Sequence, residues 1–127
     1  MIFEDFRNYC LAKNGVTEDY PFKGEAVWMK VSGKMFALAN VEELKMGVEK
    51  VPPFHFINLK CDPEKAIELR EKHPAIQPGW HQSKKHWNSV YMDGSLNDNL
   101  IRELIDHAYD IVVAGMSKKT QEELKNG

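Results

Sequence analysis

The segment from Gly79 to Ser89 is the most unusual stretch of the chain. It reads GWHQSKKHWNS, and no aspartate or glutamate occurs anywhere between His73 and Met92. Lysines make phosphate contacts, aromatic rings stack on bases, and amides bond to bases or backbone oxygens. The segment therefore predicts a local nucleic-acid contact surface. Its candidate contact residues are His81, Lys84, Lys85, His86, Trp87 and Asn88.

A further lysine, Lys34, follows Gly33 at the tip of a predicted hairpin and would add to this surface. The alternative interpretation needs no ligand. In that case Trp80 and Trp87 are core residues that flank a solvated turn, and the lysine pair lies on an ordinary surface.

The histidines offer a second chemistry, metal binding, with His55, His81, His86 and His107 as candidate ligands. His81 and His86 are five positions apart in a predicted loop-to-strand segment, whereas zinc enzymes place two histidines four apart on a helix. No cluster of Cys, Asp or Glu accompanies them. Histidines that form hydrogen bonds at the sheet edge are the simpler interpretation, so no metal is predicted.

Cys61 offers a third chemistry, because it precedes a predicted helix N-terminus, where a thiol pKa can fall. A strand-terminal buried cysteine is the simpler interpretation, since free cysteines are among the most buried residues.

His107 and Asp110 are three apart on a predicted helix and form an expected surface pair. The chain has no Walker loop, GxGxxG, GxSxG or HExxH motif. We therefore expect no catalytic residues and no cofactor.

The composition indicates one globular domain spanning residues 1–127. Hydrophobic residues make up 43% of the chain, and 17 basic against 19 acidic residues give a net charge of −2. This balance argues against a uniformly basic protein, so any nucleic-acid site must be a local patch. Two cysteines without a CxxC motif, an N-terminus unlike a signal peptide and no long apolar run predict a cytoplasmic protein without a membrane partner.

Hydrophobic periodicity and turn residues predict the elements that must position these side chains. The expected helices span residues 2–13, 62–72 and 98–116. The expected strands span residues 26–31, 34–40, 54–60 and 87–92, with a loop or short strand over 75–83. Residues 20–24 are expected to form a connection, 41–53 an irregular segment and 117–127 a frayed tail. We expect an α+β fold of two layers, with a mostly antiparallel sheet and helices on one side.

Six short motifs, taken together, resemble the MmcQ/YjbR-like family over nearly the whole chain. They are Tyr20–Phe22, Val31–Ala37, Asn58–Glu64, Pro78–His81, Lys85–Val90 and His107–Val112. The chain departs from the pattern at Ala108, where serine is usual, and at Trp80, where tyrosine is common.

The resemblance implies a small fold similar to secretion chaperones, in the order α-β-β-β-α-β-β-α. It implies DNA binding through a double-wing surface, with shared residues Lys34, Lys60, His81, Lys85, His86, Trp87 and Asn88. We therefore expect a DNA-binding protein that is a monomer or a weak homodimer. Two alternatives stay open: a chaperone-like module that binds a protein partner, and a small-molecule-binding protein that uses His81, His86 and Trp87.

Overall fold

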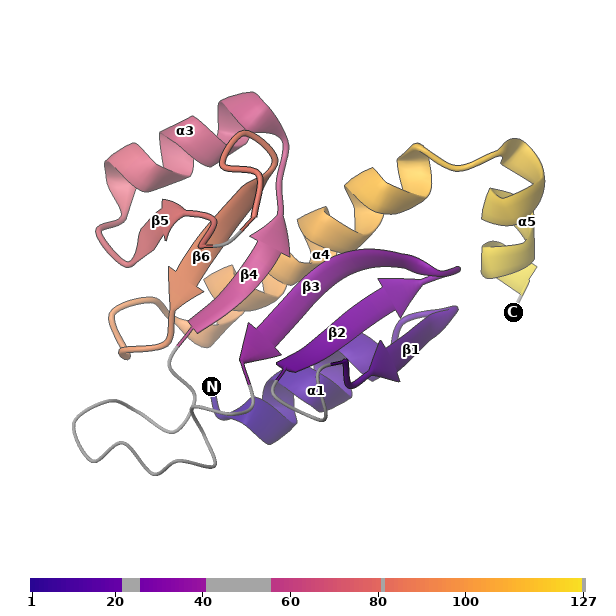
Figure 1. Ribbon diagram of the computed structural model, residues 1–127, viewed down its shortest axis with the longest axis horizontal. Coiled ribbons are helices and arrows are strands. Elements are labelled where there is room, and N and C mark those ends of the chain that lie inside the picture. The colour runs from indigo at the N-terminus through magenta and orange to yellow at the C-terminus, as the bar shows by residue number, and fades with distance from the viewer. Residues whose placement is uncertain (22–25, 41–55, 81, 127) are drawn as a thin grey trace.

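A computed structural model describes residues 1–21, 26–40, 56–80 and 82–126, which form an α+β fold around one six-stranded sheet. Figure 1 shows α1 and α4 behind this sheet. The helices are α1 (Phe3–Leu11), α3 (Pro63–Lys72), α4 (Asp98–Ala114) and α5 (Lys118–Asn126). The strands are β1 (Val16–Asp19), β2 (Ala26–Val31), β3 (Lys34–Asn40), β4 (Phe56–Lys60), β5 (Ile76–Pro78) and β6 (Trp87–Tyr91). The predicted α+β class and antiparallel sheet are confirmed.

The sheet has the strand order β1-β2-β3-β4-β6-β5, and every neighbouring pair is antiparallel. The tight turn between β2 and β3 is the predicted one, with φ of 47° at Ser32 and 83° at Gly33. The register shifts between Met29 and Lys30. In this distorted part of the β2–β3 pair, the buried ring of Phe36 meets Tyr109 of α4 edge-on, with centroids 5.7 Å apart.

The core lies between the sheet and α4. The predicted apolar stripe of this helix buries Ile101, Leu104, Ile105 and Ala108, and the helix packs on β3 and β4. These strands supply small and branched side chains to the same layer, among them Ala37. Burying a large aliphatic side chain contributes about 1.5–3 kcal/mol, so this contact positions the central strands.

The start of α3 is fixed by two hydrogen bonds. The Asp62 carboxylate caps the helix by accepting from the Lys65 amide at 3.2 Å, and Pro63 occupies the first turn. The Asp62 amide in turn donates to Nε2 of His107 on α4 at 3.1 Å. His107 therefore links the start of α3 to α4, a tertiary contact that no local sequence pattern predicts.

The observed order of elements contains one strand more than predicted, β1, at the edge of the sheet. Its four residues, VTED, carry no apolar run, and they pair with β2 directly after Gly15 turns the chain at a φ of 74°. The ion pair between Arg7 of α1 and Glu18 of β1, at 2.6 Å, joins this edge to the helix layer.

The expected frayed tail is instead the helix α5, and this part of the prediction is wrong. Leu124 of α5 is 8% exposed and packs on the turn at Gly15. Its carbonyl accepts from the Asn14 side chain at 2.8 Å. The only large apolar residue of a polar segment thus anchors it, a contact that composition does not reveal.

The expected connection at residues 20–24 lies partly outside the described residues, and the segment 41–53 and His55 lie wholly outside them. Within the part of the chain that the structure describes, no helix is long and apolar enough to cross a membrane.

His107 makes the link between α3 and α4 sensitive to pH. Burial, the largest cause, and the nearby Lys65 lower the pKa of His107, while Asp62 and Asp110 raise it less. The unfolded chain, with a histidine pKa of about 6.5, therefore binds a proton more readily than the folded protein. The stability that His107 contributes is therefore fully present above the unfolded pKa of about 6.5. It is lost as the pH falls from there through the lower pKa of the folded protein.

We expect the difference in unfolding free energy between the wild type and His107→Gln to shift in favour of the variant as the pH falls from about 7.5 to about 5.5. Glutamine keeps an acceptor oxygen and does not titrate. Urea denaturation at each pH measures this difference, and the other histidines, shared by both proteins, cancel. Parallel pH profiles for the two proteins would contradict the role of His107.

Gly15→Ala tests the docking of α5. A Cβ at this position would lie 2.2 Å from Cδ2 of Leu124, whereas a Cβ at Gly33 meets nothing within 4 Å. Both glycines have a positive φ, which costs a non-glycine residue about 1–2 kcal/mol. Gly33→Ala should show that cost alone, and Gly15→Ala should cost more.

Urea unfolding of both glycine variants, alone and combined with Leu124→Ala, isolates the α5 contact as a double-mutant cycle. The excess cost of Gly15→Ala should vanish when Leu124 is truncated. Equal costs for the two glycine variants in the wild-type background would show that α5 does not dock there.

Candidate nucleic-acid interface

The connection between β5 and β6, residues 79–86, carries most of the predicted contact residues. Figure 1 shows it beside α3, at the end of the molecule away from α5. The connection begins at Gly79, whose amide donates to the Trp87 carbonyl at 2.9 Å. A Cβ at Gly79 would lie 2.6 Å from the Trp87 Cβ, so this crossing requires glycine.

A closed set of three hydrogen bonds fastens the start of this connection to the sheet; we call it the Asn58–Ser89–Trp80 triangle. The Asn58 side chain donates to the Trp80 carbonyl at 2.9 Å, and the Trp80 amide donates to Ser89 Oγ at 2.9 Å. Ser89 Oγ donates to the side-chain oxygen of Asn58, Oδ1. Asn58 and Ser89 are cross-strand partners and are 1% and 0% exposed. The triangle therefore fixes both backbone polar groups of Trp80.

Arg70 of α3 holds the other end of the connection. Its Nε donates to the Asn88 side-chain oxygen at 2.7 Å, and one of its terminal nitrogens donates to the Lys84 carbonyl. Asn88 is 2% exposed, and its amide nitrogen donates to the Ala66 carbonyl at 3.4 Å. Asn88, a predicted contact residue, thus lies in the interior and positions Arg70.

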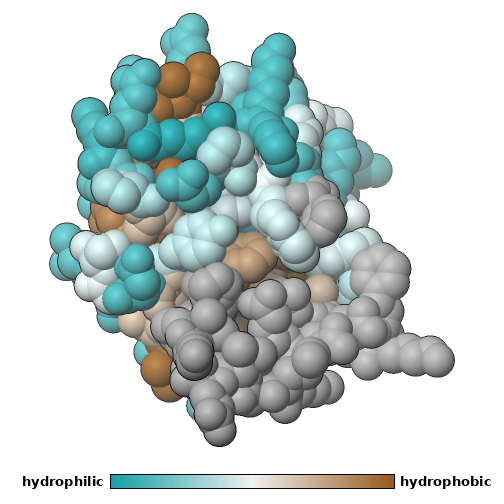
Figure 2. Space-filling model, turned by 60° about the vertical axis from the view of Figure 1, so that its left-hand side comes forward, coloured by the Kyte–Doolittle hydropathy of each residue, from teal (hydrophilic) through white to brown (hydrophobic). Residues whose placement is uncertain are grey.

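An open groove of about 370 Å³ runs between α3 and the connection. It is lined by Pro63, Ile67, Arg70, Lys84 and Lys85. Among the described residues, no carboxylate lies within 4.0 Å of these three cationic groups. Figure 2 shows the surface in this region, at the top of the view, as mainly hydrophilic around a small apolar patch. We call this site the basic groove.

Lys84 and Lys85 differ in how they are held. Lys84 Nζ donates to the Gly79 carbonyl at 3.1 Å, which closes the connection on itself. Both lysines are exposed. Lys85 is therefore the residue of the groove whose charge can be changed with the least effect on the loop.

Lys60 and Trp87 meet at the adjacent ends of β4 and β6. Lys60 Nζ lies 5.2 Å from the centroid of the Trp87 ring, a cation–π contact. Trp87 is 5% exposed, so its ring lies beneath the surface and contacts Lys60 from the interior. His86 is exposed, and its carbonyl accepts from the Cys61 amide at 2.8 Å.

Two predicted contact residues stand apart from this cluster. Lys34 is exposed at the turn between β2 and β3, which Figure 1 shows near α5, on the opposite side of the molecule from the connection. His81 lies outside the described residues. The structure thus brings Lys60, Lys84, Lys85, His86, Trp87 and Asn88 together and leaves Lys34 remote.

Sequence reasoning missed Arg70 because it lies outside the acid-free segment and on a helix with three glutamates. The available signal was its place in the last turn of a helix that follows β4 directly. The interpretation without a ligand predicts Trp80 in the core, but Trp80 is 49% exposed. Its ring meets Phe56 edge-on, with centroids 5.6 Å apart.

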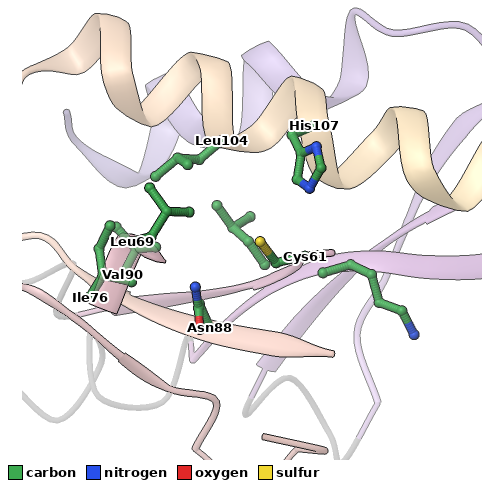
Figure 3. A pocket seen from close by; sticks show the side chains of 9 residues that line it. Cys61, Leu69, Ile76, Asn88, Val90, Leu104 and His107 are labelled. Atoms are coloured by element: carbon green, nitrogen blue, oxygen red, sulfur yellow. The ribbon is translucent and has the colours of Figure 1, made fainter. Parts of the chain in front are cut away.

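The structure offers little space for the two other chemistries, metal binding and a reactive thiol. His107 and Cys61 face a cavity of about 10 Å³ between α3, α4 and the sheet (Figure 3), which is room for about one water molecule. Burial raises the pKa of the Cys61 thiol to about 11, so it is protonated at neutral pH. Within the described part of the chain, no three His, Cys, Asp or Glu side chains lie together as a metal site requires.

Comparison with known proteins places this geometry in a family. The YjbR family model matches residues 11–111. The uncharacterized protein YbdF of Escherichia coli O157:H7 is 39% identical over 108 residues, which cover 85% of this chain and 81% of that protein. The uncharacterized protein YjbR of Escherichia coli K12 is 36% identical over 113 residues, covering 89% and 88%.

A solved structure agrees with this match. The crystal structure of Deinococcus radiodurans protein DR2400, with a DUF419 domain, superposes with a TM-score of 0.82 at 33% identity and covers 96% of this chain and 86% of that one. A Pseudomonas syringae protein has a TM-score of 0.71 at 28% identity, covering 87% and 98%. The resemblance seen in the six sequence motifs is thereby confirmed, and the chain belongs to the YjbR family.

Proposed function

We propose that this protein binds DNA without catalysing a reaction, and that the basic groove contacts the phosphates. The observation that carries the proposal is the convergence of Arg70, Lys84 and Lys85 on one groove with no described carboxylate within 4.0 Å. Phosphate contacts from arginine and lysine supply the sequence-independent part of DNA affinity.

The internal hydrogen bonds of the groove leave donors for a ligand. Arg70 has five N–H donors and uses two on Asn88 and the Lys84 carbonyl; Lys84 has three and uses one on Gly79. Because these bonds fix the two side chains before a ligand arrives, less side-chain entropy is lost on binding. The groove is therefore preorganised for oxygen acceptors.

A non-enzymatic role is supported by the state of the groups that catalysis would use. The buried Cys61 thiol has a pKa raised to about 11, and His107 Nε2 already accepts from the Asp62 amide. Neither group is poised to act as a nucleophile or a base.

A second candidate function, docking of a protein partner, is favoured by one observation. Ile67 is 54% exposed at the basic groove, and an apolar side chain among cations suits an acidic segment that also carries apolar residues. Ile67→Ser should weaken the binding of such a partner, which calorimetry measures. The same change should leave the salt-dependent binding of DNA unchanged.

Removal of one lysine tests the DNA proposal. Fluorescence anisotropy of a labelled DNA oligonucleotide, measured over a salt series, should give a log–log slope of about −2 to −3 for three phosphate contacts. Lys85→Ala should weaken binding at low salt and reduce the slope by about one.

Lys34→Ala is the matched control, because it removes the same charge from an exposed lysine on the opposite side of the molecule. It should change affinity and slope far less than Lys85→Ala. Binding that is absent or insensitive to salt, or equal losses in the two variants, would overturn the proposal.

A further inference from the structure

We infer that the DNA taken by this site is single-stranded and that one of its bases stacks on Trp80. This inference rests on the proposed function and specifies the form of its ligand. Trp80 is 49% exposed, unlike Trp87, which is 5% exposed at the other end of the same connection. The structure thus presents one indole at the surface and keeps the other inside.

The exposed indole is held rather than loose. The Asn58–Ser89–Trp80 triangle fixes the backbone of Trp80 on both sides, with hydrogen bonds of 2.9 Å to its amide and its carbonyl. On its ring, the edge-on contact with Phe56 has centroids 5.6 Å apart and planes at 81°. A ring fixed in this way loses little conformational freedom when a base stacks on it.

The connection that carries the indole also carries two residues of the basic groove, Lys84 and Lys85. Lys84, which lines the groove, donates from Nζ to the carbonyl of Gly79, the residue before Trp80. A strand whose phosphates follow Arg70, Lys84 and Lys85 would thus bring a neighbouring base to the indole. Cations that follow the backbone and an aromatic ring that stacks on a base are the two parts of a single-strand site.

A duplex fits this arrangement less well, because its bases are already paired and stacked inside the helix. Unpaired bases can leave the strand and stack on an aromatic side chain without that cost. Three cations alone would also give only modest binding to duplex phosphates, so the indole gains importance when the ligand is single-stranded.

The test compares one labelled oligonucleotide of about 12 nucleotides, a length typical of such sites, as a single strand and as a duplex. Anisotropy should show tighter binding of the single strand. Trp80→Ala should lower single-strand affinity at least about fivefold, the lower limit for losing one stacked base. Trp80→Phe, which keeps a ring on Phe56, should retain most of the affinity.

Tryptophan fluorescence supplies a readout that a merely structural role would not move. The single strand should quench emission in the wild type and in Trp28→Phe, whose replaced indole lies on β2, but much less in Trp80→Phe. Thermal melting identifies any variant that fails to fold. If Trp80→Ala does not fold, the loss of quenching in Trp80→Phe carries the test.

The outcomes separate this inference from the proposed function. Equal binding of duplex and single strand, or no change in affinity and quenching on replacing Trp80 while Lys85→Ala still weakens binding, would overturn the stacking inference and leave the phosphate groove standing. Loss of salt-dependent binding to both ligands would overturn the two together.

Discussion

The candidate surface depends on one constraint, the Asn58–Ser89–Trp80 triangle, whose two side chains are buried on the paired strands β4 and β6. Asn58 and Ser89 are polar residues paired across strands β4 and β6, and they are almost completely buried. A buried polar group left without a partner costs about 1–3 kcal/mol. Each bond of the triangle removes that cost for two groups, so the connection can detach only by exposing several of them at once. The triangle thus ties the start of the connection, at Trp80, to the strands beneath it.

The fold was largely predictable because its main elements have strong local signals. The stripe on α4, the Asp62–Pro63 start of α3 and the Ser32–Gly33 turn each follow from residues close together in the sequence. The parts that were missed are set by contacts across the chain. β1 is a polar edge strand that pairs only with β2, and α5 is anchored through Leu124 against a turn more than 100 positions away.

The candidate site was predictable in its location but not in the role of each residue. Its location follows from composition, because the acid-free segment contains the lysines that line the basic groove. Roles depend on which face of a strand a residue occupies and what covers that face. Trp87 and Trp80 have the same side chain, yet one lies under Lys60 and the other projects from a loop. Arg70 reaches the site because α3 packs on β6, a contact that no short motif predicts.

The net charge of −2 and the basic groove are compatible because salt limits the range of charge interactions to about 8–10 Å. A phosphate in the groove therefore responds to Arg70, Lys84 and Lys85 more than to carboxylates elsewhere on the molecule. With only a few phosphate contacts, ionic attraction supplies a limited share of affinity, and that share falls as salt rises. A contact that salt does not screen, such as a base against the fixed indole of Trp80, would then decide whether binding persists at physiological ionic strength. A protein of nearly neutral charge thus needs an aromatic contact more than a basic protein does.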